Sequence, residues 1–368
     1  MKVLSKIFSF IKKHKELIFL FLFTFVATLL IQMGVITRTS GLITPNRITL
    51  IAITMILVVS LNLVVGFLGE LSLGHAGFMY IGAYAAGLFI FYTKDLITVA
   101  LLRFLLAIVV GGVAAMLFGF LIGLPALRLR GDYLAIATLA FGEIVRCIFG
   151  RIRIEGFVKN PVDGFGVRSY GSPYLKFLPL ISLIFVIVTV FCVKNLIRSK
   201  HGRAIVAIRD NEIAARAMGV NITYYKLMVF AIAAFFAGVA GALFTNFQNG
   251  LVSYLKFDYN YSIEILVMVV LGGMGSLFGS LISSIVVVIL NELLASALTA
   301  LPTRFAGLKN FIYAIVLIVM MIVMSSPKLA PLREKLSGKN LAAKLKARKK
   351  AKSTDKANEL AVHEADEI

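Results

Sequence analysis

Long apolar segments recur along the whole chain, and they constrain its fold more than any other feature. A helix that crosses a bilayer needs about 20 consecutive, mostly apolar residues. Backbone groups in lipid must be satisfied within the spanning structure, and the alternating pattern of a membrane barrel is absent from the sequence. We therefore predict an all-α, polytopic helical bundle of about ten transmembrane helices. The predicted spans are 17–36, 48–68, 73–92, 99–124, 133–149, 177–196, 227–247, 255–271, 276–297 and 308–326.

Two of these segments allow a second interpretation. The first follows five lysines, as a signal peptide would. However, the apolar run Leu17–Ile36 exceeds the roughly 7–15 residues of a signal-peptide core and no cleavage site ends it, so we expect an uncleaved span. The segment 255–271 is short and carries Asp258 and Glu264, so a half-helix or re-entrant segment is its alternative.

The composition agrees with a membrane protein and excludes several other classes. Hydrophobic residues make up 60% of the 368 residues and charged residues 15%, with a mean hydropathy of +0.93. Soluble domains are only about half apolar, so a typical soluble enzyme and a disordered chain are excluded. The net charge of +20 does not indicate nucleic-acid binding, because most of the sequence would lie in lipid.

The placement of lysine and arginine predicts the orientation, since basic loops remain in the cytoplasm. We divide the chain into a cytoplasmic basic N-terminus (1–16), a transmembrane domain (17–326) with a basic cytoplasmic loop at 197–226, and a cytoplasmic tail (327–368). The tail is first basic and then acidic, and we expect it to be largely disordered. The segment 150–176 carries five basic residues, but we place it outside because moving it would put 197–226 on the wrong face.

Ionisable side chains in apolar segments are informative because each is costly to bury. Glu143 and Arg146 are three residues apart on one predicted helix, where they form an internal ion pair or line a pathway. His75 follows Gly74 near the start of a span and is interpreted as a helix-end histidine, since no second His or Cys lies at metal-ligand spacing. The remaining charged positions are Glu70, Glu264 and Glu292.

Small and sulfur-containing residues carry weaker signals. Cys147 and Cys192 lie in or beside apolar runs and are expected to be buried small hydrophobic residues rather than a disulfide or a metal site. Small residues at four-residue spacing allow helices in lipid to approach closely. Three such pairs are Gly82/Ala86, Gly119/Gly123 and Gly238/Ala242.

Catalytic motifs are absent from the sequence. The chain has four histidines, and neither HExxH nor GxSxG occurs. No GxxxxGK[ST] loop is present, so any ATP hydrolysis must come from another subunit. We predict that the chain is not an enzyme and that it carries no metal and no cofactor.

Four glycine-rich or charged motifs occur in a characteristic order. They are GFLGELSLGHAGF at 66–78, LPALRLRGDYLAIATLAFGEIVR at 124–146, GRAIVAIRDNEIAARAMG at 202–219 and MVVLGGMGSLFG at 268–279. Together they resemble the permease subunit of branched-chain amino acid ABC importers, over roughly residues 45–326. The implied function is half of the translocation pathway for leucine, isoleucine and valine in a bacterial plasma (inner) membrane. Glu70 stands where a neutral residue is more usual, and the sequence offers no account of its charge.

The resemblance also implies partners. They are a second homologous permease, two cytoplasmic P-loop ATPases that bind ATP and magnesium, and an extracytoplasmic solute-binding protein, around a chain embedded in the lipid bilayer. The segment 203–219 resembles the coupling helix that seats in the ATPase. Asp210 or Asn211 is expected to cap this helix at its N-terminus and Gly219 to end it. The coupling residues are Arg209, Asp210, Glu212, Ala214, Ala215 and Gly219.

The same family implies a gate and a docking surface. We predict that Arg151 and Arg153 receive acidic groups of the binding protein. The glycine-rich turn 272–279 takes part in gating or is an ordinary turn between two helices. The predicted gate and pathway residues are Ser72, Gly74, His75, Glu143, Arg146, Glu264, Gly272, Gly273 and Gly275.

Two alternatives to leucine-type import remain open. A urea or short-amide permease of the same architecture would carry nearly the same motifs. An ion-coupled secondary transporter would need a carboxylate at membrane depth and no ATPase, and Glu264 is the candidate for that carboxylate.

Overall fold

The computed structural model describes residues 44–126, 129, 131–152, 165–166, 177–247 and 251–298, together with Ile315 and Ile318. The chain divides into two compact units, residues 1–309 and 310–368, and the description below concerns the first. The predicted spans 17–36 and 308–326 and the tail 327–368 lie outside the residues described as continuous segments.

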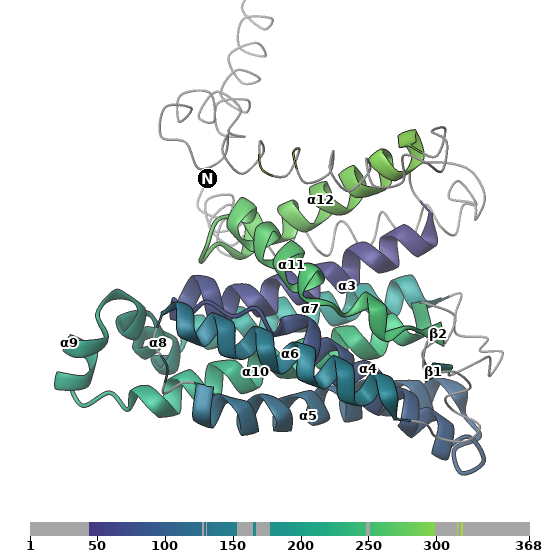
Figure 1. Cartoon of the computed structure of the whole chain (residues 1–368), viewed down its shortest axis with the longest axis horizontal. Helices are drawn as coiled ribbons and strands as arrows, with labels where there is room; N and C mark the ends of the chain where they lie inside the picture. Colours follow the sequence, from purple (N-terminus) through teal and green to yellow (C-terminus); the bar gives the residue numbers. More distant parts are fainter. Residues whose placement is uncertain are drawn as a thin grey trace, which may run out of the picture. The chain divides into compact units, whose positions relative to one another are not determined.

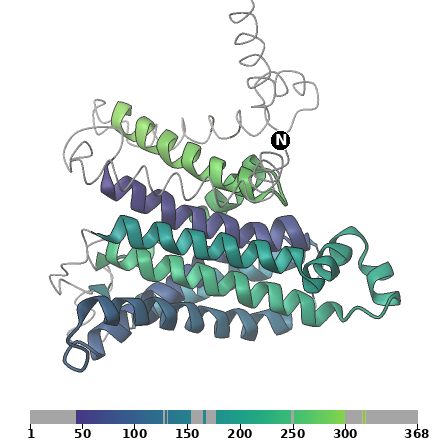
Figure 2. The same ribbon diagram turned by 180° about the vertical axis from the view of Figure 1, so that it is seen from behind.

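Helices dominate the described part of the chain (Figures 1 and 2). The predicted all-α fold is confirmed, since the only described strands are two residues long each and pair antiparallel, Phe165 with Val252 and Gly166 with Leu251. The elements in chain order are α3 (Pro45–Asn62), η1 (Leu63–Leu68), α4 (His75–Tyr92), α5 (Ala100–Ala126), α6 (Asp132–Arg151), β1 (Phe165–Gly166), α7 (Leu178–Arg198), α8 (Lys200–Asp210), α9 (Glu212–Ala217), α10 (Ile222–Phe247), β2 (Leu251–Val252), η3 (Tyr254–Lys256), α11 (Tyr259–Gly272) and α12 (Leu277–Leu298).

Six described helices are long and apolar enough to cross a membrane, and they correspond to the spans predicted at 48–68, 73–92, 99–124, 133–149, 177–196 and 227–247. The predicted span 276–297 corresponds to α12. The predicted full span at 255–271 is wrong, because η3 and a break at Phe257–Asp258 leave α11 only 14 residues long. At 1.5 Å per residue such a helix reaches about 21 Å, less than the roughly 30 Å of a bilayer core. The half-helix alternative describes it correctly.

α3 is the central helix of the bundle. It begins at Pro45 after Thr44, whose hydroxyl accepts a hydrogen bond from the Arg47 amide, and it continues into the π-helical turn η1. Its most apolar stretch is 94% buried, and α7, α10, α11 and α12 pack around it. A helix that is apolar all round is expected to be buried in this way.

Small residues bring α4, α5 and α10 together, as the small-residue pairs predict. A side chain at Gly82 would collide with the backbone of Gly238, and the space beside Gly111 on α5 is filled by the methyl groups of Ala86 and Ala242. Close backbone approach strengthens the van der Waals packing that helps to hold helices together in lipid. This three-helix contact is the most extensive in the described part of the bundle.

The two cysteines are free but exposed, so the prediction that they are buried is wrong. Cys147 lies on α6 and Cys192 on α7, whose apolar stretches are only 33% and 39% buried. An apolar run in a membrane protein need not pack inside the protein, since lipid accepts its outer face.

Candidate functional site

The short helix α9 forms by local hydrogen bonding, as its sequence predicts. Asn211 is the N-terminal cap, because its side chain accepts a hydrogen bond from the Ala214 amide at 3.0 Å. At the other end Gly219 has a φ of +82°, and the amides of Gly219 and Val220 donate to the carbonyls of Arg216 and Ala215. This is the Schellman arrangement, which favours glycine. α9 is thereby held as a separate, well-defined turn.

α9 presents one apolar face to the bundle and another away from it. Ala215 is buried, whereas Ala214 is exposed. Ile213 and Met218 are 82% and 84% exposed, among the most exposed large apolar side chains in the described part of the chain. The helix lies with α8 at the end of the bundle opposite β1 and β2 (Figures 1 and 2). Exposed apolar groups on a projecting helix are typical of a protein–protein contact.

A buried lysine connects α9 to the segment that follows η1. The ammonium of Lys226, in the first turns of α10, contacts the carboxylate of Glu70 and lies 3.1 Å from Glu212 Oε2. The Lys226 side chain is only 5% exposed and that of Glu70 13%. A buried cation needs such partners because it has lost its hydration. The charge of Glu70, for which the sequence offers no account, is therefore one part of an ion triad.

Arg209 makes a second connection in the same region, between α8 and η1. It lies at the C-terminal end of α8, where Asp210 accepts hydrogen bonds from its guanidinium at 2.9 and 3.1 Å. Another nitrogen of the same guanidinium donates to the Gly66 carbonyl of η1 at 3.1 Å. Gly69, with a φ of +82°, leaves the room that the Arg209 side chain occupies. Arg209 thus joins α8 to the end of the central helix.

The glycine-rich turn between α11 and α12 packs against η1. Gly275 has a φ of +79°, and a side chain at Gly275 would lie 3.3 Å from the Gly66 carbonyl oxygen and 3.6 Å from the Arg209 guanidinium. Gly273 has a φ of +88°. Gly272 approaches the Gly279 backbone so closely that a side chain would not fit. The turn therefore belongs to the same contact region as the coupling residues.

Asn62 joins this turn to α3 and was not among the predicted site residues. Its side-chain oxygen accepts from the Gly275 amide at 2.9 Å, and its amide group donates to Ser280 Oγ at 2.7 Å and to the Ser276 carbonyl at 3.2 Å. Asn62 is fully buried. The available signal was a lone amide within the apolar run 48–68, since such a group requires partners at membrane depth.

The segment 69–74 between η1 and α4 is packed rather than free. Ser72 is buried, and a side chain at Gly74 would collide with the Thr138 carbonyl of α6. The Thr138 hydroxyl also accepts a hydrogen bond from the Leu73 amide at 3.0 Å. His75 begins α4 as predicted, and its Nε2 lies 2.8 Å from the buried Ser60 hydroxyl. Glu70 therefore sits at one end of a segment held by α6.

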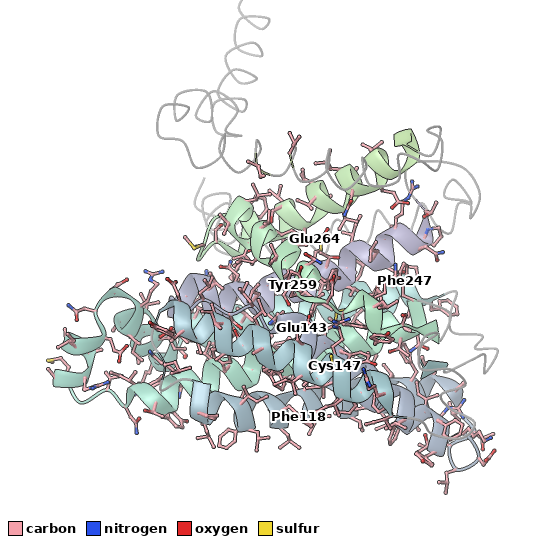
Figure 3. All side chains as sticks on the ribbon, viewed as in Figure 1. Phe118, Glu143, Cys147, Phe247, Tyr259 and Glu264 are labelled. Carbon is pink, nitrogen blue, oxygen red and sulfur yellow. The ribbon has the colours of Figure 1, made fainter. Side chains whose placement is uncertain are left out.

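Glu143 and Arg146 form the predicted ion pair, with 2.6 Å between Arg146 Nη2 and Glu143 Oε2. The second carboxylate oxygen of Glu143 accepts a hydrogen bond from the Tyr259 amide at 3.0 Å. Arg146 also lies over the Tyr254 ring. The pair thus fixes the start of α11 against α6, and Figure 3 shows Glu143 and Tyr259 together.

Glu264 lies elsewhere on α11, apart from this ion pair (Figure 3). The Asn291 side-chain amide of α12 donates to its Oε1 at 2.9 Å, and Glu264 lines a cavity of about 340 Å³. The predicted gate and pathway residues therefore separate into four places. The turn residues meet the coupling residues, and Ser72, Gly74 and His75 lie in the packed segment that leads into α4. Glu143 and Arg146 anchor α11, and Glu264 faces the cavity.

The two predicted docking residues are only partly covered by the structure. Arg151 is the last residue of α6 and is exposed. Arg153 lies outside the described residues.

A bundle of long apolar helices, with a half-helix and a projecting capped helix, defines a polytopic membrane protein. The chain belongs to the family described as branched-chain amino acid transport system / permease component, whose sequence model matches residues 43–324. The motifs that predicted this family at 66–78, 124–146, 202–219 and 268–279 all lie within the match.

Individual relatives agree with this assignment. The chain is 38% identical over 277 residues to the high-affinity branched-chain amino acid transport system permease protein LivM of Escherichia coli, and 38% identical over 272 residues to LivM of Salmonella typhimurium. These matches cover 68% and 67% of this chain, but only 63% and 62% of the LivM proteins. The ribose import permease protein RbsC of Bacillus subtilis is 28% identical over 43% of this chain and 50% of its own length. No solved structure matches the chain.

Proposed function

We propose that the chain is the membrane-spanning permease subunit of an ATP-driven importer of leucine, isoleucine and valine. Membership of the permease family supports transport, and the greater identity to the LivM proteins than to the ribose permease supports amino acids as cargo. A second, related permease completes the pathway, and the termini and the α8–α9 end face the cytoplasm of a bacterial plasma membrane. ATP and magnesium bind to partner subunits.

The observation that carries this proposal is the pair of side-chain contacts that join the α8–α9 region to the membrane bundle. The exposed residues Ile213 of α9 and Met218 just after it suit a groove on an ATPase. Lys226 connects α9 to Glu70 after η1, and Arg209 connects α8 to Gly66 and lies beside the turn at Gly275. A displacement of α9 by the ATPase would therefore be passed to η1 and to the α11–α12 turn. Packed side chains and hydrogen-bonded networks of this kind carry coupling between distant sites.

At the opposite end we propose that an extracytoplasmic solute-binding protein docks near Arg151 and Arg153. The exposed position of Arg151 at the end of α6 supports this placement. Basic groups on the rim of a contact chiefly set the orientation and the rate of association.

Reconstitution of the permease pair with its ATPases in proteoliposomes tests the proposal. We expect uptake of radiolabelled leucine that requires both ATP and the binding protein. Uptake of urea in place of leucine would establish the amide-permease alternative. Uptake driven by an ion gradient without ATP would establish a secondary transporter and contradict the proposed function.

A further inference from the structure

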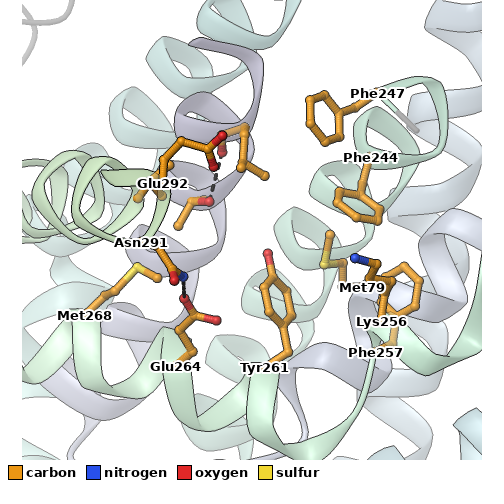
Figure 4. Close-up of a pocket in the computed structure, with 13 residues that line it drawn as sticks. Met79, Phe244, Phe247, Lys256, Phe257, Tyr261, Glu264, Met268, Asn291 and Glu292 are labelled. Carbon is orange, nitrogen blue, oxygen red and sulfur yellow. Dashed lines mark hydrogen bonds between the residues drawn. The ribbon is translucent and has the colours of Figure 1, made fainter. Parts of the chain in front are cut away.

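A cavity of about 340 Å³ lies among α3, α4, α10, α11 and α12, with η3 at its edge (Figure 4). Its volume lies within the range of about 300–1,000 Å³ that is usual for small-molecule sites. None of the coupling residues lines it. The cavity is thus a separate feature from the polar network beside α9.

Charged groups of both signs reach this cavity. Glu264 of α11 and Lys256 of η3 extend into it from opposite sides, with Tyr261 between them (Figure 4). One oxygen of Glu264 is oriented by the Asn291 amide at 2.9 Å. A second carboxylate on the lining, that of Glu292, is paired with Arg47 at 3.1 Å. The lining therefore offers an anionic group and a cationic group on separate walls.

Apart from Thr54, the rest of the lining is apolar. Met79, Phe257 and Met268 are each at most 2% exposed, and the Phe244 ring lies beside Phe257 with 5.6 Å between ring centroids. Thioether and aromatic groups adapt to aliphatic side chains of varied shape. An apolar wall between two opposite charges suits a small molecule that has an ammonium, a carboxylate and an aliphatic group.

We propose that this cavity is a transit site for a zwitterionic amino acid with an aliphatic side chain. Glu264 receives the α-ammonium, Lys256 receives the α-carboxylate, and the side chain lies against Met79, Phe244 and Phe257. This inference rests on the proposed function and adds to it a site on the permease itself. The physical reason is that a zwitterion leaving water loses the hydration of both charges, and each then needs an opposite charge.

The test uses the assembled complex of permeases and ATPases. ATP-driven uptake of leucine into proteoliposomes is measured first. Absence of uptake by the wild type would overturn the proposed function, and the site with it.

Equilibrium binding of radiolabelled leucine to the purified complex, without the solute-binding protein, is measured second. We expect saturable binding that is about tenfold weaker in Glu264→Gln and in Lys256→Met, as loss of a charge-assisted hydrogen bond predicts. Asp95→Asn, an exposed carboxylate in the turn after α4, is the matched control and should leave binding unchanged.

Two leucine analogues distinguish recognition from a structural effect. 3-Methylbutylamine lacks the carboxylate of leucine, and 4-methylpentanoate lacks its ammonium. Both should therefore compete poorly with leucine for the wild-type complex. The preference for leucine over 3-methylbutylamine should disappear in Lys256→Met and persist in Glu264→Gln. The preference for leucine over 4-methylpentanoate should disappear in Glu264→Gln and persist in Lys256→Met.

If Glu264→Gln prevents assembly, Lys256→Met decides the question, because Lys256 is an exposed residue of a short turn. Leucine uptake by the wild type with unchanged affinity and unchanged analogue preference in Lys256→Met would overturn the site. The proposed function would then stand.

Discussion

Lys226 Nζ lies 3.1 Å from Glu212 Oε2, and the same nitrogen contacts Glu70. Glu212 is the first residue of α9, while Glu70 follows η1 at the end of the central helix. A nearly buried cation between two carboxylates couples these elements, because movement of either one would cost the ammonium one of its two contacts. The coupling region and the membrane bundle are therefore joined by an ionic contact.

Replacing Lys226 with methionine should destabilise the bundle and uncouple transport. Loss of one partner of a buried ion pair costs about 3–5 kcal/mol, because the remaining charge is left without compensation. We expect a lower midpoint of thermal unfolding and loss of leucine uptake in the reconstituted complex. Adding Glu70→Gln should recover much of the stability without recovering uptake. Full uptake by Lys226→Met would contradict a coupling role for the triad.

Gly275→Ala should impair transport more than its backbone strain alone explains. A left-handed conformation costs a residue other than glycine roughly 1–2 kcal/mol, and here the methyl group would also press against the Gly66 carbonyl. The control is Gly131→Ala, whose φ of +58° and ψ of −130° also disfavour alanine but which has nothing within 4 Å of the added methyl group. We expect ATP-driven uptake to fall in Gly275→Ala and to remain in Gly131→Ala. An equal loss in both would indicate strain alone.

Asn62→Leu should detach the α11–α12 turn from α3. The Gly275 amide would lose its partner, at about 1–3 kcal/mol for a group left unsatisfied, whereas the Ser280 hydroxyl would keep its bond to the Ser276 carbonyl. Ser284→Ala is the matched control on α12, since among the described residues its hydroxyl bonds only to the Leu281 carbonyl of its own helix. Thermal unfolding should shift clearly for Asn62→Leu and little for Ser284→Ala. Similar shifts in the two variants would show that Asn62 does not stabilise the contact between α3 and the α11–α12 turn.

A charge on the outer face of α9 should prevent the ATPase subunits from binding without disturbing the fold. Ile213→Asp or Met218→Asp places a carboxylate on a residue more than 80% exposed, where the folded bundle tolerates it. We expect the ATPase subunits to be lost on co-purification while the unfolding midpoint is retained. Leu96→Asp, at a residue 81% exposed in the turn after α4, should retain them. Normal ATPase recovery with both α9 variants would place the contact elsewhere.

Reversing the charge at Arg151 and Arg153 together should weaken stimulation of ATP hydrolysis by the solute-binding protein. The expected effect is a slower association that depends on ionic strength, because screening acts on exposed charges. Lys94→Glu, an exposed cation in the turn after α4, is the control. Unchanged stimulation at low salt in the double variant would remove these residues from the docking surface.

Hydropathy predicted most of the helices but not where one of them breaks. The six confirmed spans depend on stretches of apolar residues that any window reveals. At 255–271 the same window is misleading, because Asp258 caps a new helix by accepting from the Tyr261 amide at 3.1 Å. The cysteines show the converse error. Apolar surroundings predicted burial, but in lipid they are equally compatible with an outward position.

The sequence by itself determined the apolar segments, the caps of α9 and the Glu143–Arg146 pair, because each depends on residues within a few positions of one another. Only the tertiary structure decided which distant residues are the partners of the buried charged and amide groups. Glu70 meets Lys226 across 156 residues and Asn62 meets Ser280 across 218. Hydropathy shows which charges and amides fall within apolar segments and therefore require a partner. The identity of that partner depends on how the helices cross.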